Sequence, residues 1–458
     1  MTLRGASLGL LVAVVMSLPL VSFAQGTAPT TPAPKTPPAA EAPPAEQAPP
    51  AEPTPPAEEA PAAAPAPEIV PPPAPSTEPT QVVITAPVTP EPAPAEPAAA
   101  DAQSERKGWS RGGAILQEDV EPSVTALHAK NLDVRLGALT QIQFAPYVGE
   151  DALIANGDAA SEVGFRVRRA RLGVEADFGW NLGAFLNLDL LANSSTDGIV
   201  SDAKVTWSPV DEARFSVGSG KVPFSRGALL SSRRIGTIER ALAVGAITPA
   251  RRLGFTVEGA VLDGHIAYIG ALMNGTDGFG VGNQFGGVLY GGRIELSPFD
   301  RPDARDPNAS GVSVGGGLLY DDGPGTNTVA WSADIYGALW GSYLTVEVLC
   351  NKTTPDDAPL VAPGVADSVR RCGGYVEGGY TLPWRPADMA IQPAVRAEIY
   401  DDDRSLKNAG DVIMITAGVN VDVLDPYVRA QLNYVARRER YGQGRANDLV
   451  VLSLQGSF

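Results

Sequence analysis

The stretch Val163–Leu190, VGFRVRRARLGVEADFGWNLGAFLNLDL, decides the fold, because apolar and polar residues alternate on both sides of a short turn. In its first half, one face carries Leu172, Val174, Ala176 and Phe178. The opposite face carries Arg169, Arg171, Glu175 and Asp177. Successive side chains of a β-strand point to opposite faces, so this period of two predicts a strand. The alternation resumes after Gly179–Asn181, which predicts a tight turn between two antiparallel strands.

The same alternation repeats along the chain from Leu132 to Phe458. Sixteen candidate strands begin near residues 132, 163, 182, 199, 213, 252, 264, 288, 310, 329, 341, 370, 390, 410, 426 and 447. The connections alternate between short and long, except that residues 298–308 are long where a short turn is expected. A soluble β-sandwich shares the alternation, but the strand length, the even strand number and the alternating connections are typical of a membrane barrel. We therefore expect an all-β fold, a transmembrane antiparallel β-barrel of about sixteen strands with both termini on the periplasmic side.

Three segments precede the predicted barrel. Residues 1–24 have the charged start, apolar centre and small-residue cleavage site of a signal peptide, with an N-terminal membrane anchor as the alternative. Residues 25–105 are rich in Pro, Ala and Glu, and eleven acids accompany one base, which predicts a disordered periplasmic arm. This arm is either a spacer that contacts peptidoglycan or a solvated tail. Residues 106–131 are predicted to be a linker, and the barrel domain covers residues 132–458.

The composition argues against several classes of function. The formal net charge is -17 and the bases form no clustered basic face, which argues against nucleic-acid binding. No apolar run beyond the signal peptide is long enough for a membrane-spanning helix. The only histidines, His128 and His265, are too few for a histidine metal cluster, and a Ser-His hydrolase built on His265 is the weakest alternative. We expect no catalytic residue, no metal site and no cofactor.

Cys350 and Cys372 are the two cysteines of the chain and lie near the two ends of one predicted outer loop. In an exported protein such a pair is expected to form a disulfide, which would restrain the loop. Two free thiols are the alternative.

The segment Lys221–Arg252, KVPFSRGALLSSRRIGTIERALAVGAITPARR, is an unusually long gap between two predicted strands. It carries six arginines against one acid, Glu239. Its apolar residues need a surface to pack on, which argues against disorder. We therefore expect this segment, the third outer loop, to fold into the lumen and narrow it.

Two blocks of the sequence resemble the phosphate-selective porins O and P of Gram-negative outer membranes. Phe165–Gly173 resembles the family's Arg-rich second strand. The second block resembles the beginning of the family's third outer loop and comprises Lys221–Ser225, Ser231-Ser232 and Glu239–Ala241. The closing Leu454–Phe458 is similar to the aromatic-terminated strand that outer-membrane barrels share. The resemblance covers about residues 130–458.

This resemblance implies a sixteen-stranded, usually trimeric channel whose third loop lies inside, with anions passing along lumen arginines. The family's lysine-rich funnels have no counterpart here. The lysines of the barrel segment are Lys204, Lys221, Lys352 and Lys407. The identity of the transported anion therefore stays open.

The candidate anion-contacting residues are arginines of the loop and of the strands. From the loop we select Arg226, Arg233, Arg234 and Arg240. From the strands, where alternation predicts that they face the lumen, we select Arg169, Arg171, Arg252, Arg396 and Arg429. Arginine in a narrow, partly dehydrated pore favours anions, and its planar fork binds oxyanions through two hydrogen bonds. The alternative is that these arginines pair with lumen acids and brace the wall.

Together these patterns predict an outer-membrane porin of a Gram-negative bacterium that conducts small solutes passively, with a preference for phosphate or other oxyanions. The expected partners are outer-membrane lipid and lipopolysaccharide, small anionic solutes, further copies in a homotrimer, and peptidoglycan through the Pro-rich arm. Two alternatives stay open. One is a non-selective general diffusion porin of the same fold, and the other is an envelope tether whose arm contacts the cell wall.

Overall fold

The computed structural model describes residues 124–149, 162–191, 199–210, 212–275, 286–299, 310–356, 368–423, 427–442 and 444–458, with residues 116 and 283. The chain divides into two units, residues 1–91 and 92–458, and all described residues belong to the second. The predicted signal peptide, the predicted arm and most of the predicted linker lie outside the described residues. Within the described ranges, no helix is long and apolar enough to cross a membrane.

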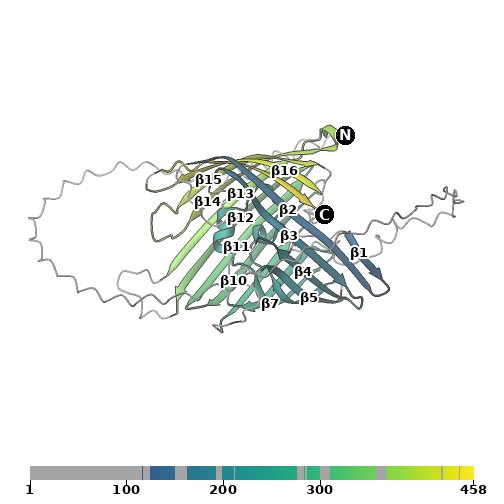
Figure 1. Cartoon of the computed structure of the whole chain (residues 1–458). Coiled ribbons are helices and arrows are strands. Elements are labelled where there is room, and N and C mark those ends of the chain that lie inside the picture. Colours follow the sequence, from purple (N-terminus) through teal and green to yellow (C-terminus); the bar gives the residue numbers. More distant parts are fainter. Residues whose placement is uncertain are drawn as a thin grey trace, which may run out of the picture. The chain divides into compact units, whose positions relative to one another are not determined.

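The described part of the second unit forms one closed antiparallel barrel of sixteen tilted strands, β2–β17 (Figure 1). The strands are β2 (Leu132–Val148), β3 (Gly164–Asp177), β4 (Leu182–Asp189), β5 (Val200–Val210), β6 (Ala213–Gly220), β7 (Arg252–Val261), β8 (Ile266–Asn274), β9 (Val288–Leu296), β10 (Gly311–Gly323), β11 (Thr326–Leu339), β12 (Ser342–Pro355), β13 (Val369–Tyr380), β14 (Ala390–Asp401), β15 (Val412–Val423), β16 (Val428–Glu439) and β17 (Leu449–Ser457). A 3-10 turn, η2 (Pro386–Asp388), lies between β13 and β14.

Each strand of the barrel pairs with the next one along the chain. The barrel closes where β17 pairs with β2, from Ser457 opposite Leu139 to Leu449 opposite Val148. Every predicted strand start lies within three residues of an observed one. The predicted all-β barrel of sixteen strands is therefore confirmed.

One further strand, β1 (Val124–Ala129), was not predicted, because its residues fall within the segment taken as a linker. It pairs with the beginning of β2, from Ala129 opposite Leu132 to Val124 opposite Leu136. This part of β2 extends beyond the residues that pair with β17, so β1 covers an otherwise open edge. All six residues of β1 are exposed, so the strand lacks the alternation of buried and exposed positions by which the other strands were recognised.

The two faces of the barrel wall differ in polarity. The outward face exposes large apolar side chains, among them Phe165, Leu318, Val329 and Trp331. The inward face buries polar side chains, among them Gln141, Asn187, Glu347 and Asn420. An apolar exterior around a polar interior is the arrangement that membrane barrels require, since lipid surrounds the wall and water fills the lumen.

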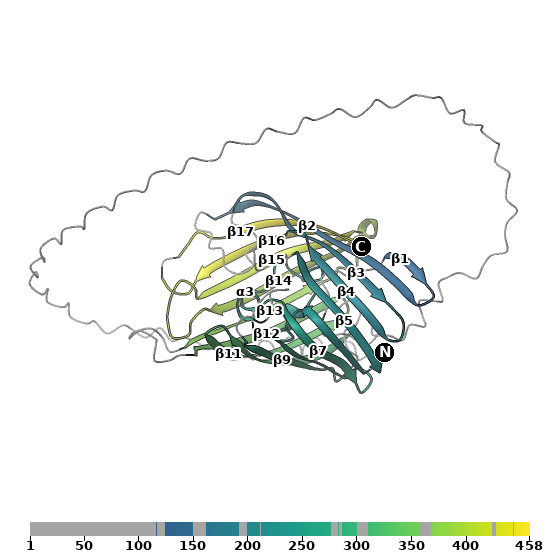
Figure 2. The same cartoon turned by 60° about the horizontal axis from the view of Figure 1, so that its bottom comes forward.

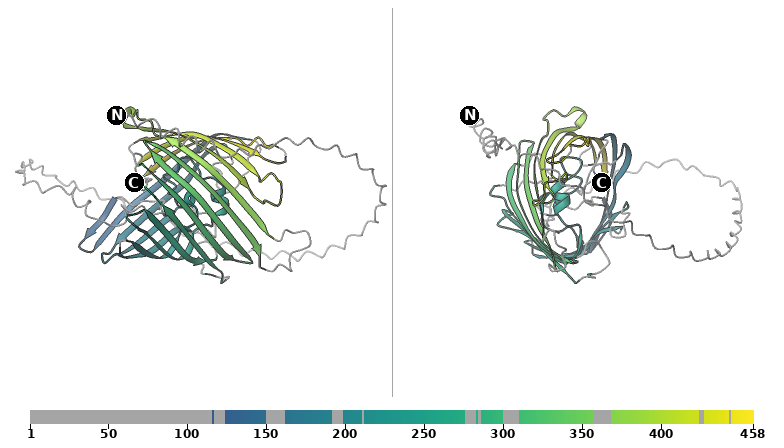
Figure 3. Two further views of the ribbon diagram at one scale, coloured as in Figure 1. Left: turned by 180° about the vertical axis from the view of Figure 1, so that it is seen from behind. Right: turned by 90° about the vertical axis from the view of Figure 1, so that its left-hand side faces the viewer.

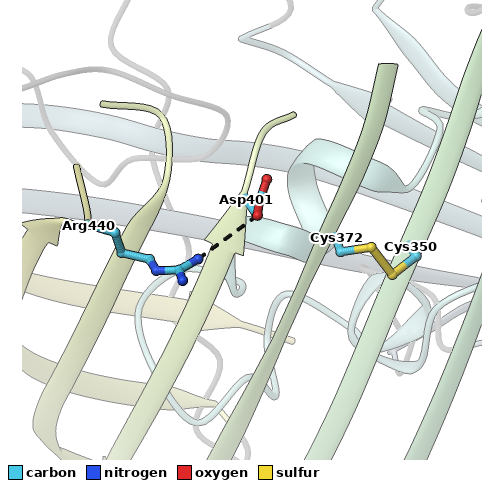
Figure 4. The surroundings of a disulfide bond; sticks show 4 residues. All are labelled: Cys350, Cys372, Asp401 and Arg440. Atoms are coloured by element: carbon cyan, nitrogen blue, oxygen red, sulfur yellow. Dashed lines mark ion pairs between the residues drawn. A yellow bond between two sulfur atoms is a disulfide. The ribbon is translucent and has the colours of Figure 1, made fainter. Parts of the chain in front are cut away.

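Cys350 of β12 and Cys372 of β13 lie directly opposite each other and form a disulfide with an S–S distance of 2.12 Å (Figure 4). The neighbouring Leu349 and Asn351 are buried on the lumen side, so Cys350 points outward. The disulfide therefore joins the outer ends of two strands on the exterior of the wall. Nearby, Asp401 and Arg440 form an ion pair at 3.9 Å.

The segment between β6 and β7 lies inside the barrel. Its two short helices, α2 (Arg226–Leu229) and α3 (Leu242–Ile247), lie within the ring of strands (Figures 2 and 3). Apolar loop residues form one buried cluster with inward residues of β8–β15. The cluster includes Val222, Phe224, Leu242, Val244 and Ile247 of the loop and Met273, Leu289, Leu319, Leu349 and Met414 of the wall. The predicted inward fold of the third outer loop is confirmed.

Candidate functional site

Apolar contact fixes the loop against one half of the wall. Phe224, Leu229 and Val244 are each no more than 2% exposed. Burying a side chain of this size contributes roughly 1.5–3 kcal/mol relative to leaving it in water. Several such residues together hold the loop on β8–β15. Ile238 of the loop forms a second, smaller cluster with Ala145 of β2 and with Leu449 and Val451 of β17.

Two wall carboxylates bind the first backbone N–H groups of the loop helices. Glu347 of β12 accepts hydrogen bonds from the N–H groups of Arg226 at 2.8 Å and Gly227 at 3.0 Å. It also accepts from the hydroxyl groups of Ser225 at 2.8 Å and Tyr375 at 2.9 Å. Glu398 of β14 accepts from the N–H of Leu242 at 2.6 Å, where α3 begins. These N–H groups have no partner within a helix, so the two carboxylates satisfy buried donors and orient the loop.

Two of the four predicted loop arginines hold the loop in place. Arg226 contacts Asp334 of β11 at 2.6 Å and Glu295 of β9 at 2.7 Å. Arg240 donates to the backbone oxygens of Gly227 at 2.9 Å and Leu230 at 2.7 Å, within the loop itself.

The other two predicted loop arginines are adjacent in the chain. Arg233 is buried, at 8% exposure, and its backbone oxygen accepts hydrogen bonds from Arg429 at 3.4 Å and Gln455 at 3.3 Å. Arg234 is half-buried, and its N–H donates to the backbone oxygen of Ser231 at 3.0 Å.

Four of the predicted strand arginines contact acids of the wall. The pairs are Arg171–Asp189 at 2.8 Å, Arg252–Asp321 at 2.9 Å, Arg396–Glu398 at 3.0 Å and Arg429–Asp422 at 3.1 Å. In three of them the acid lies on a different strand from the arginine, so the pair joins two parts of the wall, whereas Arg396 and Glu398 share β14. These contacts match the bracing role that the sequence left as an alternative.

The fifth strand arginine, Arg169, belongs to a group on β3 that strict alternation did not reveal. Gln141 of β2 pairs with Arg169 and the next residue, Ile142, pairs with Val167, so Arg168 is an extra residue in a β-bulge. A bulge sets two residues against one on the partner strand, and here Arg168 and Arg169 both reach the lumen. The change of parity also turns Arg166 inward, where it donates to Gln143 at 2.8 Å.

The outward positions of β3 confirm this geometry. Phe165 and Val167 are 79% and 49% exposed on the outside of the barrel. Arg166 and Arg168 were not predicted to face the lumen, because strict alternation gives the whole strand one period. The adjacent pair Arg168-Arg169 interrupts that period and was the available signal.

Glu239 of the loop meets three arginines of β3. Arg168 donates from Nε to Oε1 at 2.7 Å and from Nη2 to Oε2 at 3.1 Å. Arg169 Nη2 lies 3.3 Å from Oε2, and Arg166 Nη2 lies 3.8 Å from Oε1. Burial opposes ionisation of Glu239, but the charges of Arg169 and Arg168 outweigh it and lower the pKa of Glu239 to about 2. Three guanidinium groups therefore lie within 4 Å of one carboxylate.

The acids of β9–β14, across the lumen from β3, lie mostly beneath the loop. Arg293 shares Glu295 and Asp334 with the loop arginine Arg226, and Arg396 lies between Glu377 and Glu398. The buried acids of these strands include Glu295, Asp334, Glu347, Glu377 and Glu398. By contrast, the side chains of Arg166 and Arg168 are 34% and 30% exposed. The acids that contact the loop are therefore covered, whereas the side chains of Arg166 and Arg168 keep part of their surface exposed.

Among the described residues, no group of three or more His, Cys, Asp or Glu side chains is arranged to hold a metal ion. Nδ1 of His265 lies 2.7 Å from the backbone oxygen of Ser297, and His128 is exposed on β1.

Several solved structures are similar to this chain at low sequence identity. Among solved structures, an anion-selective porin from Comamonas acidovorans is 15% identical, with a TM-score of 0.49 over 71% of this chain and 100% of that one. The outer membrane channel DcaP of Acinetobacter baumannii is 14% identical, with a TM-score of 0.47 over 73% of this chain and 100% of that one. The trimer form of OmpT, an outer membrane protein of Vibrio cholerae, is 12% identical, with a TM-score of 0.48 over 72% of this chain and 100% of that one. A comparison with curated protein sequences finds no match.

The sequence model of one family matches part of the chain. Residues 150–301 match the model described as phosphate-selective porin O and P. This range contains β3 with its arginines and the whole inward loop with Glu239. The resemblance predicted from the sequence is thereby confirmed over residues 150–301, which match the phosphate-selective porin O and P model.

Proposed function

We propose that the protein is an outer-membrane porin that conducts small anions passively, and that the arginines of β3 set its preference for anions. The observation that carries this proposal is the group of Arg166, Arg168 and Arg169 around the single carboxylate of Glu239. The side chains of Arg166 and Arg168 are 34% and 30% exposed, so each is partly accessible from the lumen.

The physical basis is the strength of charge in a narrow passage. A protein wall of low polarizability limits the screening that bulk water provides, so a net positive group attracts anions and repels cations there. Arginine remains charged at all relevant pH values and presents two parallel donors to an oxyanion. No energy source or cofactor is needed for diffusion down a gradient.

In this proposal the arginines of β3, rather than those of the loop, provide the positive charge that selects anions. Arg226 and Arg240 are engaged in holding the loop, and the pairs at Arg171, Arg252, Arg396 and Arg429 brace the wall. We retain Arg233 and Arg234 as secondary contributors, since both lie on the loop that narrows the lumen. The homotrimer and contact with lipopolysaccharide are proposed on the family resemblance. Contact of the Pro-rich arm with peptidoglycan rests on its composition alone.

The test is the reversal potential of the purified protein in a planar bilayer under a potassium chloride gradient. We expect the wild type to prefer chloride, and the variant Arg166→Ala with Arg168→Ala to shift by tens of percent or more toward equal permeability. The matched control, Arg135→Ala with Arg214→Ala, also removes two charges. It takes them from lumen arginines paired with Glu175 at 2.9 Å and with Glu258 at 3.7 Å.

A smaller shift in the control supports the assignment to β3. If both double variants shift the reversal potential equally, selectivity is a property of the total lumen charge. If the wild type itself shows no preference, the protein is a general diffusion porin.

A further inference from the structure

The carboxylate of Glu239 is bound in the way that a free carboxylate ligand would be. Nε and Nη2 of Arg168 each donate to a different oxygen of Glu239, at 2.7 and 3.1 Å. This two-point contact is the geometry in which a planar guanidinium recognises a planar carboxylate. Arg169 and the amide of Gln143, both at 3.3 Å, complete the surroundings of the two oxygens.

The backbone at Glu239 is held from the other side of the lumen. Its carbonyl oxygen accepts from Nη1 of Arg396 at 2.7 Å and from the hydroxyl of Thr237 at 2.9 Å. The side chain therefore extends from a loop that is anchored on β14 to arginines that belong to β3. The carboxyl group of Glu239 therefore lies among the three arginines and is attached to a loop whose position is fixed.

A simple structural ion pair does not explain the composition of this group. One arginine is enough to neutralise one carboxylate, but here Arg168 and Arg169 both donate to it and Arg166 lies 3.8 Å from it. Like charges brought together repel, so the second and third arginines add an electrostatic cost that a single bound anion only partly offsets. A site with surplus positive charge has residual attraction for an anion from solution.

We propose that Arg166, Arg168 and Arg169 form a binding subsite for small carboxylate solutes, and that the side chain of Glu239 is its tethered competitor. The inference rests on the proposed function and adds to it a solute class. An incoming carboxylate takes the place of Glu239 on the arginines, and Glu239 returns when the solute leaves. A channel needs binding that is favourable enough for entry and weak enough for release, and a competing side chain weakens binding in this way.

The experiment uses the purified full-length protein in planar bilayers and measures how acetate reduces the chloride current. The competitor is removed by Glu239→Gln, which keeps the shape of the side chain and removes its charge. We expect the half-blocking acetate concentration to fall roughly tenfold, which corresponds to about 1.4 kcal/mol. Inorganic phosphate is titrated in parallel, and its half-blocking concentration is expected to fall less.

Two further variants test whether the change in acetate block arises at the subsite. Glu175→Gln neutralises another acid of β3 that is paired with Arg135 rather than with the subsite, and it should leave the acetate block unchanged. Combining Glu239→Gln with Arg168→Ala should abolish the gain, because the two-point contact is lost. If the gain persists in the combined variant, it arises from a displaced loop and the inference is wrong.

The outcomes distinguish this inference from the proposed function. An anion-selective wild type whose acetate block is unchanged by Glu239→Gln refutes the competitor and leaves the proposed function standing. A larger gain for phosphate than for acetate refutes the carboxylate class. A wild type without anion preference refutes the proposed function on its own measurement, and the acetate series then has no selective site to report.

Discussion

At the scale of single residues, Glu239 links the ionisation of one carboxyl group to the position of the loop. Its neighbours across the lumen are Arg166, Arg168, Arg169 and Gln143. Burial raises its pKa, but the arginine charges prevail and the pKa falls to about 2, below the ordinary value of 4.5. A depressed acid pKa stabilises the folded state fully above the unfolded value, and this contribution is lost as the pH falls through the folded value.

The resulting prediction concerns thermal stability as a function of pH. Above about pH 5 the wild type should melt at a higher temperature than Glu239→Gln, because only the wild type has the charged contact. The difference in Tm should shrink as the pH falls from about 4.5 toward 2, where the carboxyl group becomes neutral. Circular dichroism melts of both proteins in detergent measure it. A difference that stays constant over this range contradicts the ion-pair account.

Prediction from sequence was least complete for the contacts that single residues make. The partners of the loop lie far away in the chain, since Glu347 binds Ser225 across 122 positions. No local pattern records such contacts, so the sequence indicated an inward loop but not which arginines would hold it. Arg226 was therefore selected as an anion contact, whereas its guanidinium lies on Asp334 and Glu295.

At the scale of elements, the strands were predictable because the wall imposes one requirement on all of them. Lipid lies on one side and a polar lumen on the other, so every strand repeats a period of two and its start can be located. β1 has no such contrast, since all of its residues are exposed, and it was missed. The bulge in β3 was missed for the related reason that it changes the period within one strand.

The bulge leads to a prediction about deletion. Removing Arg168 should restore regular alternation along β3, with Arg166 and Arg169 still inward, so the barrel should fold. Removing Val174, which lies in a regular part of β3, should reverse the facing of every residue on one side of it and prevent folding. The yield of heat-modifiable folded barrel on gels measures both. Equal loss of folding in the two deletions would show that the bulge is needed for the wall itself.

At the scale of the whole barrel, the sign of the accessible charge differs from the sign of the total charge. The full chain has a formal net charge of -17, which by itself predicts a preference for cations. The lumen separates these charges, because the loop covers Glu347, Glu377 and Glu398 while the side chains of Arg166 and Arg168 remain partly exposed. We infer that the loop contributes to the proposed selectivity by covering acids as well as by narrowing the passage.

This separation predicts how selectivity depends on salt. Partly exposed arginines are screened by mobile ions, whose Debye length falls from about 10 Å at 0.1 M to about 3 Å at 1 M. The ratio of chloride to potassium permeability should therefore be largest under dilute gradients and decline toward one at molar salt. Reversal potentials at a fixed concentration ratio and increasing absolute concentration measure it. A ratio that does not change with salt would assign selectivity to groups shielded from solvent, and the β3 arginines would then be the wrong residues.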